Sequence, residues 1–476
     1  MPVVASGEMA PHDAAIQCKM TRMLPSTEFA LLSRIATEQT TNRAPSLVAG
    51  VVRGDELVWS GGRGFVDDVP PTNDTQYRLG SITKSLTAAL VMRLRDEGKL
   101  DLNDRVDAHL DDAKTEAFGR LTIAQLLAHT SGITSESPGE WWERSIGDTW
   151  EALAADLTPA ELKLRAGKQF HYSNTGYGIL GEIIARLRES TWLDALRDEV
   201  LTPLGMSRTT PHPEGVAAKG WAVHPFADVV LPEPTPDAGA MAPAGQLWST
   251  VDDLARWTSF TAGFSGDVLH PDTVAEMRQA VAVDDGDVWA MGYGLGFQLV
   301  RQHGRSYAGH TGSMPGFVAC SMVDQTSGTG ALAMANTTAG VSILGVVIDL
   351  IRTADEREPA LPEPWRPADI DLKLLELTGL WHWGPSPIHV KVLPNGWLDL
   401  APVGAGRRSR FRPVGDDVWE GLDGYYAGET LRVERDTQGV PHHLNLATFI
   451  FTRTPYDPSA PIPGGVDEAG WRSATE

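Results

Sequence analysis

The chain has 476 residues, 42% of them hydrophobic, which is enough for two or three domains with well-packed cores. Its formal net charge of −22 at pH 7 disfavours nucleic acid or an anionic membrane as the main partner, because both carry negative charge themselves. We therefore expect a small or neutral substrate, or a docking patch that is basic only locally.

The first residues show no targeting pattern. The segment from Met1 to Met23 contains no apolar run, so it has the form neither of a signal peptide nor of a membrane anchor. Translation could start at Met1, Met20 or Met23. The only cysteines are Cys18 and Cys320, so we expect no disulfide framework and predict a reducing, cytoplasmic location.

Helix and strand signals alternate in the first part of the chain. The pattern predicts a helix over Thr27–Thr41 and then a hairpin with strands at Ser46–Val52 and Glu56–Gly61. From Leu100 to about Thr250 the pattern is mostly helical, most clearly over Asn174–Arg188. The five prolines between His224 and Gln246 predict a long loop there, followed by a helix over Val251–Phe260.

Strand patterns return in the second half of the chain. Four strands are expected, at Tyr293–Val300, Ser306–His310, Gly316–Val323 and Gly330–Ala335, with a buried helix starting at Val341. Strands at both ends of this region enclose the helical part. This arrangement predicts one antiparallel sheet that carries a helical subdomain.

A composition change marks a second domain. Residues Ala354–Asp371 are acidic and contain four prolines, which is typical of a linker, and short alternating strands with turns follow over Leu377–Arg453. We expect a small β-barrel or sandwich there. The predicted organisation is a flexible segment at 1–25, a catalytic domain at 26–353 with its helical subdomain at about 100–250, a linker at 354–371, a barrel at 372–456 and a flexible tail at 457–476.

The stretch from Tyr77 to Gly98 carries the first candidate site. An extended piece ends at Gly80, and apolar residues then recur at helical spacing, so Ser81 opens a helix and Lys84 lies on the same face one turn later. A buried lysine can deprotonate a serine hydroxyl, and the N–H groups of a helix start stabilise a developing oxyanion. Taken alone, this pattern is more typical of an N-cap serine followed by a surface lysine.

Two further motifs strengthen the catalytic interpretation. Tyr172 and Asn174 lie two positions apart just before a helix, so an extended backbone points both side chains to one side. Tyr172 can relay protons, and Asn174 can donate to a substrate amide and accept from Lys84.

The third motif lies on a strand, where His310 and Thr311 are expected to face the substrate. Gly312 allows a substrate backbone to lie close along the strand edge, and the Ser313 N–H is a candidate second donor of the oxyanion hole, beside that of Ser81.

Together the three motifs resemble the signature of the serine β-lactamase and penicillin-binding-protein superfamily, in its class C β-lactamase and D,D-peptidase branch. The resemblance spans about Thr27–Asp349 and includes Gln125–Gly132 and Leu247–Thr250. It implies an α+β fold of the β-lactamase/transpeptidase type, with an antiparallel sheet, flanking helices and a helical subdomain, and an acyl-enzyme on Ser81. We expect Tyr172 or His310 to act as the base when water or the peptide's own amine attacks this acyl-enzyme. A lipocalin-like β-barrel is the expected C-terminal domain.

Other conspicuous residues allow two interpretations each. Trp141 and Trp142 pack in the core by default, and otherwise form a lid that contacts the substrate. His129 is interpreted as part of a structural turn, and the arginines between 407 and 412 as a solvated hairpin or as a docking patch for an acidic carrier protein. No residues show metal-ligand spacing, and we expect neither a metal nor a cofactor.

The resemblance also narrows the reaction. His310 stands where β-lactamases and many D,D-peptidases have a lysine that holds a substrate carboxylate, and histidine is largely neutral near pH 7. The chain is most similar in organisation to penicillin-binding-protein-type thioesterases, which take a nonribosomal peptide from its carrier protein and cyclise it head to tail. The alternative is a cytoplasmic D-aminopeptidase or esterase. A β-lactamase and a non-catalytic scaffold are less favoured.

Overall fold

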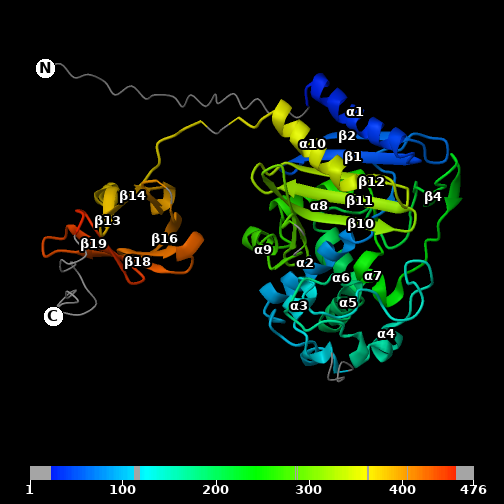
Figure 1. Cartoon of the computed structure of the whole chain (residues 1–476), viewed down its shortest axis with the longest axis horizontal. Helices are drawn as coiled ribbons and strands as arrows, with labels where there is room; N and C mark the ends of the chain where they lie inside the picture. Colours follow the sequence, from blue (N-terminus) through cyan, green and yellow to red (C-terminus); the bar gives the residue numbers. More distant parts are fainter. Residues whose placement is uncertain are drawn as a thin grey trace, which may run out of the picture. The chain divides into compact units, whose positions relative to one another are not determined.

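The computed structural model describes residues 23–111, 118–284, 286, 288–361, 364–404 and 406–456. They form two compact units that divide between Ala360 and Leu361, and each unit is described by itself (Figure 1). Cys18, Met1, Met20 and the predicted tail at 457–476 lie outside the described residues.

An eight-stranded antiparallel sheet forms the centre of the first unit. Its strand order is β2-β1-β12-β11-β10-β9-β8-β7, so the two ends of the unit's sequence meet where β1 pairs with β12. The strands are β1 (Ser46–Arg53), β2 (Glu56–Gly64), β7 (Ala282–Val283), β8 (Met291–Tyr293), β9 (Gln298–Gln302), β10 (Arg305–Met314), β11 (Phe317–Asp324) and β12 (Gly330–Ala335). The predicted sheet is thereby confirmed.

One predicted strand is divided in the structure. The segment expected as a single strand over Tyr293–Val300 forms β8 and β9 with a turn between them, because Gly294 donates to the Phe297 carbonyl and Gly296 adopts a φ of +91°. A side chain disfavours this left-handed conformation, so the glycine allows the chain to reverse there.

Helices cover both faces of the sheet. Helices α1 (Pro25–Thr41) and α10 (Ile343–Arg357) pack on one face through Leu31, Ile35 and Val347, with Cys320 buried beneath them as expected. Helices α2 (Ile82–Asp96) and α8 (Val251–Ala262) cover the other face. Helix α10 extends to Arg357, so the predicted linker begins later than residue 354.

The helical region gathers beside β10 (Figure 1). It is less regular than its sequence pattern suggests, because several helices are a single turn or two. Its helices are α3 (Ile123–Leu127), α4 (Trp150–Asp156), α5 (Asn174–Arg188), α6 (Trp192–Leu196), a π-helix (Arg197–Leu201) and α7 (Ala242–Gly245), and α9 (Pro271–Met277) follows α8. The predicted loop at 224–246 also contains part of a ribbon of β4 (Trp221–Val223) and β5 (Val230–Pro232).

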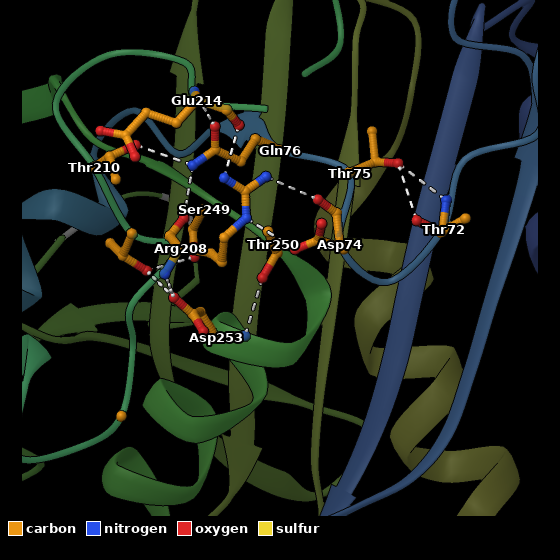
Figure 2. Close-up of polar contacts among 12 residues, drawn as sticks. Thr72, Asp74, Thr75, Gln76, Arg208, Thr210, Glu214, Ser249, Thr250 and Asp253 are labelled. Carbon is orange, nitrogen blue, oxygen red and sulfur yellow. Dashed lines mark hydrogen bonds and ion pairs between the residues drawn. The ribbon is translucent and has the colours of Figure 1, made fainter. Parts of the chain in front are cut away.

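A polar network fixes the strand that leads into the candidate site. The β3 strand (Tyr77–Arg78) pairs with β6 (Trp248–Ser249), and the side chain of Gln76 bonds the Arg208 carbonyl at 2.7 Å and the Glu214 amide at 2.6 Å. Figure 2 shows these contacts and the Asp253 carboxylate, which accepts from the Arg208 amide. The segment just before Ser81 is therefore held on both sides.

The second unit is a closed eight-stranded barrel, as the sequence resemblance implied. Its strands are β13 (Gly379–Trp383), β14 (Ser386–Val392), β15 (Leu398–Pro402), β16 (Ser409–Gly415), β17 (Val418–Gly421), β18 (Thr430–Arg435), β19 (Pro441–Leu446) and β20 (Phe449–Thr452). His382 opposite Thr452 closes it. Buried side chains such as Trp381 and Phe411 fill the interior.

The arginine run lies on β16 and just before it, and its positive charge is largely paired. Arg408, Arg410 and Arg412 form ion pairs with Asp399, Asp423 and Glu420, and Arg407 lies over the ring of Tyr425. The structure therefore favours the solvated hairpin over a basic docking patch. None of the described helices combines the length and apolar character that a membrane span requires.

Candidate active site

Ser81 and Lys84 form a direct pair at the start of α2. The Lys84 Nζ donates to the Ser81 Oγ at 2.9 Å and to the Ala244 carbonyl at 2.7 Å. Ala244 belongs to α7, which Thr87 also holds by donating to the Pro243 carbonyl. The single turn of α7 thus fixes the lysine so that its amine points at the serine hydroxyl.

Burial prepares Lys84 to act as a base. The side chain is 0% exposed, and this desolvation lowers its pKa from the usual value near 10.5 to about 7. The carboxylates of Glu136 and Glu143 act in the opposite direction and raise the pKa. A large part of the lysine is therefore neutral near pH 7, which is the form that can accept the serine proton.

Tyr172 completes the group around the nucleophile. It lines the same pocket as Ser81, and the Lys84 Nζ lies 5.1 Å from the centre of its ring. Burial raises the pKa of Tyr172 above its usual value, so the phenol stays protonated near neutral pH and can pass a proton rather than hold a charge.

His129 positions Tyr172 from behind. The two rings lie 4.1 Å apart with a 31° angle between their planes, and the His129 Nδ1 accepts from the Ser173 amide at 3.0 Å. Ser173 caps α5 by accepting from the Gly176 amide. His129 also adopts a φ of +55° in a turn, so it combines the expected turn with a supporting role for the site.

Asn174 is turned toward an acidic residue that the sequence did not single out. Its Nδ2 donates to both carboxylate oxygens of Glu136 at 2.9 Å, while its buried Oδ1 has no partner among the described residues. The Trp142 indole also donates to Glu136, at 2.8 Å. The amide of Asn174 is thus oriented by Glu136, and the prediction that its oxygen accepts from Lys84 is wrong, because Lys84 donates to Ser81 and Ala244 instead.

Two glycines bring β10 against the nucleophile. A Cβ atom on Gly80, whose φ is +56°, would lie 2.6 Å from the Ser313 nitrogen. A Cβ atom on Gly312 would lie 1.9 Å from the Leu79 oxygen and 3.0 Å from the Ser81 nitrogen. Since neither position has room for a side chain, the two glycines allow the backbone around Ser81 and Ser313 to approach closely, and the two amides remain the predicted donors of an oxyanion hole.

A pocket of about 530 Å³ opens onto this group. It is lined by Ser81, Tyr172, Gln298, Thr311, Gly312, Ser313, Val318, Ser342, Ile343 and Leu344. A larger pocket of about 830 Å³ lies along α5 and α7 and shares no residue with it. The chemistry of Ser81 therefore belongs to the smaller pocket, one wall of which is the β10 edge.

His310 does not face the pocket, and the expectation that it does is wrong. The side chain is 1% exposed, its Nε2 accepts from the Tyr293 hydroxyl at 2.7 Å and its Nδ1 donates to the Thr311 carbonyl. Burial, with Lys84 nearby, lowers its pKa to about 3. His310 is therefore a neutral positioning residue, and its side chain is not available as a base for attack on the acyl-enzyme.

The two tryptophans do not contact the pocket either. Trp142 is 5% exposed and packs beside Gly245, and Trp141 is 60% exposed and donates to Glu143. Their interpretation as substrate-contacting residues is wrong in this structure. They instead orient Glu136 and Glu143, the two carboxylates that influence Lys84.

Several contributors were not predicted from the sequence. Glu136, Gln298, Tyr293 and the Ala244 carbonyl come from loops or short elements without a recognisable motif. Only the long predicted loop at 224–246 signalled that a site residue could lie there, because loops of that length in compact domains are often functional.

Comparison with known proteins agrees with this geometry. The family model described as Beta-lactamase matches residues 31–354, and the one described as Domain of unknown function (DUF7586) matches residues 370–453. Penicillin-binding protein 4 of Amycolatopsis lactamdurans is 32% identical over 294 residues, which cover 58% of this chain and 75% of that protein. Beta-lactamase-like protein 2 of Dictyostelium discoideum is 27% identical over 277 residues, 54% of this chain and 49% of that protein. The chain thus spans about half the length of the second relative.

Solved structures extend the likeness. The octameric penicillin-binding protein homologue from Pyrococcus abyssi has a TM-score of 0.61 and 22% identity, covering 89% of this chain and 99% of its own. SurE has a TM-score of 0.59 and 24% identity, and the match covers 90% of this chain and 99% of the SurE chain. A D-stereospecific amidohydrolase from Streptomyces sp. has a TM-score of 0.56 and 26% identity, and the match covers 69% of this chain and 97% of the amidohydrolase chain.

Proposed function

Because the chain belongs to the beta-lactamase family and is a serine hydrolase or acyltransferase of that family, we propose that it forms a peptidyl ester on Ser81 and releases the peptide by head-to-tail cyclisation. This is the activity of a penicillin-binding-protein-type thioesterase. Its donor is then a nonribosomal peptide thioester, presented by a carrier protein. The observation that carries the first step is the Lys84 Nζ at 2.9 Å from the Ser81 Oγ.

Ser81, Lys84 and Tyr172 have successive roles in acylation. The Ser81 oxygen attacks the thioester carbonyl while its proton moves to the neutral Lys84 amine, and the developing oxyanion accepts from the amides of Ser81 and Ser313. The carbon–sulfur bond then breaks. The leaving thiolate takes up the proton that Lys84 received, relayed through Tyr172, which lines the pocket beside Ser81 and lies close to Lys84.

The second step needs an amine at the acyl-enzyme. A peptide N-terminus arrives as an ammonium at neutral pH, and Glu136 and Glu143 are two carboxylates close enough to Lys84 to raise its pKa. They favour the approach of a positive group to this side of the site. The ammonium first loses one proton to water, and the neutral amine then attacks the ester carbonyl. As the bond from the carbonyl carbon to the Ser81 oxygen breaks, the proton that the amine gives up passes to that oxygen through the neutral Lys84, with Tyr172 as a relay. His310 takes no part, because it is buried and hydrogen-bonded.

Hydrolysis by a D-aminopeptidase or esterase is the second candidate. It is favoured by the 26% identity to a D-stereospecific amidohydrolase, and Glu136 and Glu143 would equally attract the free amino group of an aminoacyl substrate. In that case water replaces the amine as the acceptor of the acyl group.

One experiment separates the candidates. A linear peptide thioester ending in a D-residue is incubated with the enzyme and with Ser81→Ala, and products and intact protein are followed by mass spectrometry. A product lighter than the linear acid by one water, absent with Ser81→Ala, supports the cyclase. Linear acid alone supports the hydrolase. A fluorophosphonate that fails to label Ser81 would contradict both.

A further inference from the structure

The donors of Thr311 are already occupied inside the pocket. Both its amide N–H and its hydroxyl donate to the Gln298 Oε1, each at 2.9 Å. Because an N–H can only donate, the oxygen of the Gln298 amide must face Thr311, and the Nε2 group lies on the other side of the amide. Both residues line the pocket beside Ser81.

Gln298 stands where the edge of β10 becomes open. The pairing of β10 with β9 ends at Gly309 opposite Gln298, and β10 continues without a partner strand on that side through Thr311 to Ser313. A substrate that extends along this edge from the oxyanion hole therefore meets Gln298 over Thr311.

The leaving group is the part of the substrate that comes to lie there. Tyr172, which passes the proton to the leaving atom, lines the same pocket as Thr311 and Gln298. The groups attached to the leaving atom thus lie toward Thr311 and Gln298.

This part of the pocket offers nothing to balance a negative charge. The described residues that line it include no lysine, arginine or histidine, and Lys84 is fully buried behind Ser81. A carboxylate placed over Thr311 would lose water, would find both Thr311 donors taken, and would face the Gln298 oxygen. A neutral carbonyl placed there can instead accept from the Gln298 Nε2.

We propose that Gln298 is the specificity-determining residue for the leaving group: its oxygen blocks the two Thr311 donors against a carboxylate, and its amide nitrogen receives a neutral carbonyl. The enzyme therefore takes thioester or amide donors whose leaving group carries an amide, and rejects donors whose leaving group carries a free carboxylate. This inference rests on the proposed acylation of Ser81.

Two matched thioesters test it. They share one peptidyl group and differ only in the thiol, which is mercaptoacetamide in one and mercaptoacetate in the other. Thiol release gives kcat/KM, and protection of Ser81 from a fluorophosphonate gives the relative occupancy of the site by each thioester. The kcat/KM of the wild-type enzyme is expected to be roughly tenfold or more higher for the amide thioester, because the carboxylate of the other thioester would be left without hydrogen-bond partners in the pocket.

The variants separate specificity from folding. Gln298→Lys supplies a cation and is expected to reduce or reverse the preference, and Gln298→Met frees the Thr311 donors and moves the ratio in the same direction. Gln302→Lys adds the same charge to the exposed end of β9 and is expected to leave the ratio unchanged. A purely structural role for Gln298 would lower both rates together.

The outcomes are distinguishable from those of the proposed function. The assignment of Gln298 is overturned if the wild-type enzyme turns over the two thioesters equally and both protect Ser81 equally, or if neither thioester has any effect. In that case fluorophosphonate labelling still establishes Ser81 as the nucleophile. Loss of that labelling would instead contradict the proposed function itself.

Discussion

The amine of Lys84 lies 2.9 Å from the hydroxyl of Ser81 in a site where the lysine has no exposed surface. Burial lowers the pKa of Lys84 to about 7, so the fraction of neutral lysine rises as the pH rises through that value. We predict that the rate of Ser81 acylation rises from about pH 5.5 to a plateau by about pH 8.5. Stopped-flow labelling with a fluorophosphonate across this range measures it. A profile that is flat there would show that Lys84 is not the base.

The same titration predicts the effect of a neighbouring carboxylate. Glu143 raises the pKa of Lys84 by its negative charge, so Glu143→Gln removes a stabilising influence on the ammonium form. The acylation profile should therefore shift to lower pH. Glu143 is preferred to Glu136 for this test, because Glu136 also holds Asn174 and Trp142. A shift to higher pH would contradict the assigned direction.

The contacts of the nucleophile were largely predictable, because local pattern determines them. The spacing of Ser81 and Lys84 on one helix face needs only 3.6-residue periodicity, and Tyr172 precedes a helix with a clear apolar stripe. The barrel and the sheet likewise follow from alternating strands. The features that the sequence predicted well are those determined by residues close together along the chain.

The direction of the side chain of His310 was not predictable in the same way. An alternating strand pattern indicates which residues share a face, but the expectation rested on a family position where lysine reaches the substrate. In the structure the shorter ring is held by Tyr293, which comes from a different strand. Glu136 and Gln298 likewise act across distant segments, and one sequence does not show such contacts.

The close approach of β10 to Ser81 depends on glycine. We predict that Gly312→Ala reduces acylation of Ser81 by roughly 100-fold or more, because its methyl group would lie 1.9 Å from the Leu79 oxygen and force the Ser81 and Ser313 amides apart. The comparison is with Gly304→Ala, at a φ of +72° with open space around it. That variant should lose about 1 kcal/mol of stability and keep its activity. Equal activities of the two variants would contradict the steric argument.

The arginines of the barrel differ in what they neutralise. Arg408 bonds both oxygens of Asp399, which is 2% exposed, whereas the partner of Arg410, Asp423, is in contact with solvent. Arg408→Ala leaves a buried carboxylate without its cation, so it should lower the unfolding temperature of the barrel more than Arg410→Ala does. Differential scanning calorimetry of the full chain measures both. Equal losses would show that burial of Asp399 does not decide the effect.

Lys84 should also lower stability at neutral pH. Its pKa is about 7 in the folded protein and near 10.5 when exposed, so between these values the unfolded chain binds a proton that the folded chain does not. The free energy of unfolding therefore rises with pH across this window. The buried lysine destabilises the fold most at the lower end, near pH 7, and no longer does so above pH 10.5. Compared with Lys84→Met, the wild-type protein should gain free energy of unfolding on the order of a few kcal/mol between pH 7 and pH 10.5. Urea unfolding of both proteins at several pH values measures the difference. A difference that does not change with pH would mean that the lysine keeps its ordinary pKa in the folded state, and the base assigned to Ser81 would have to be another group.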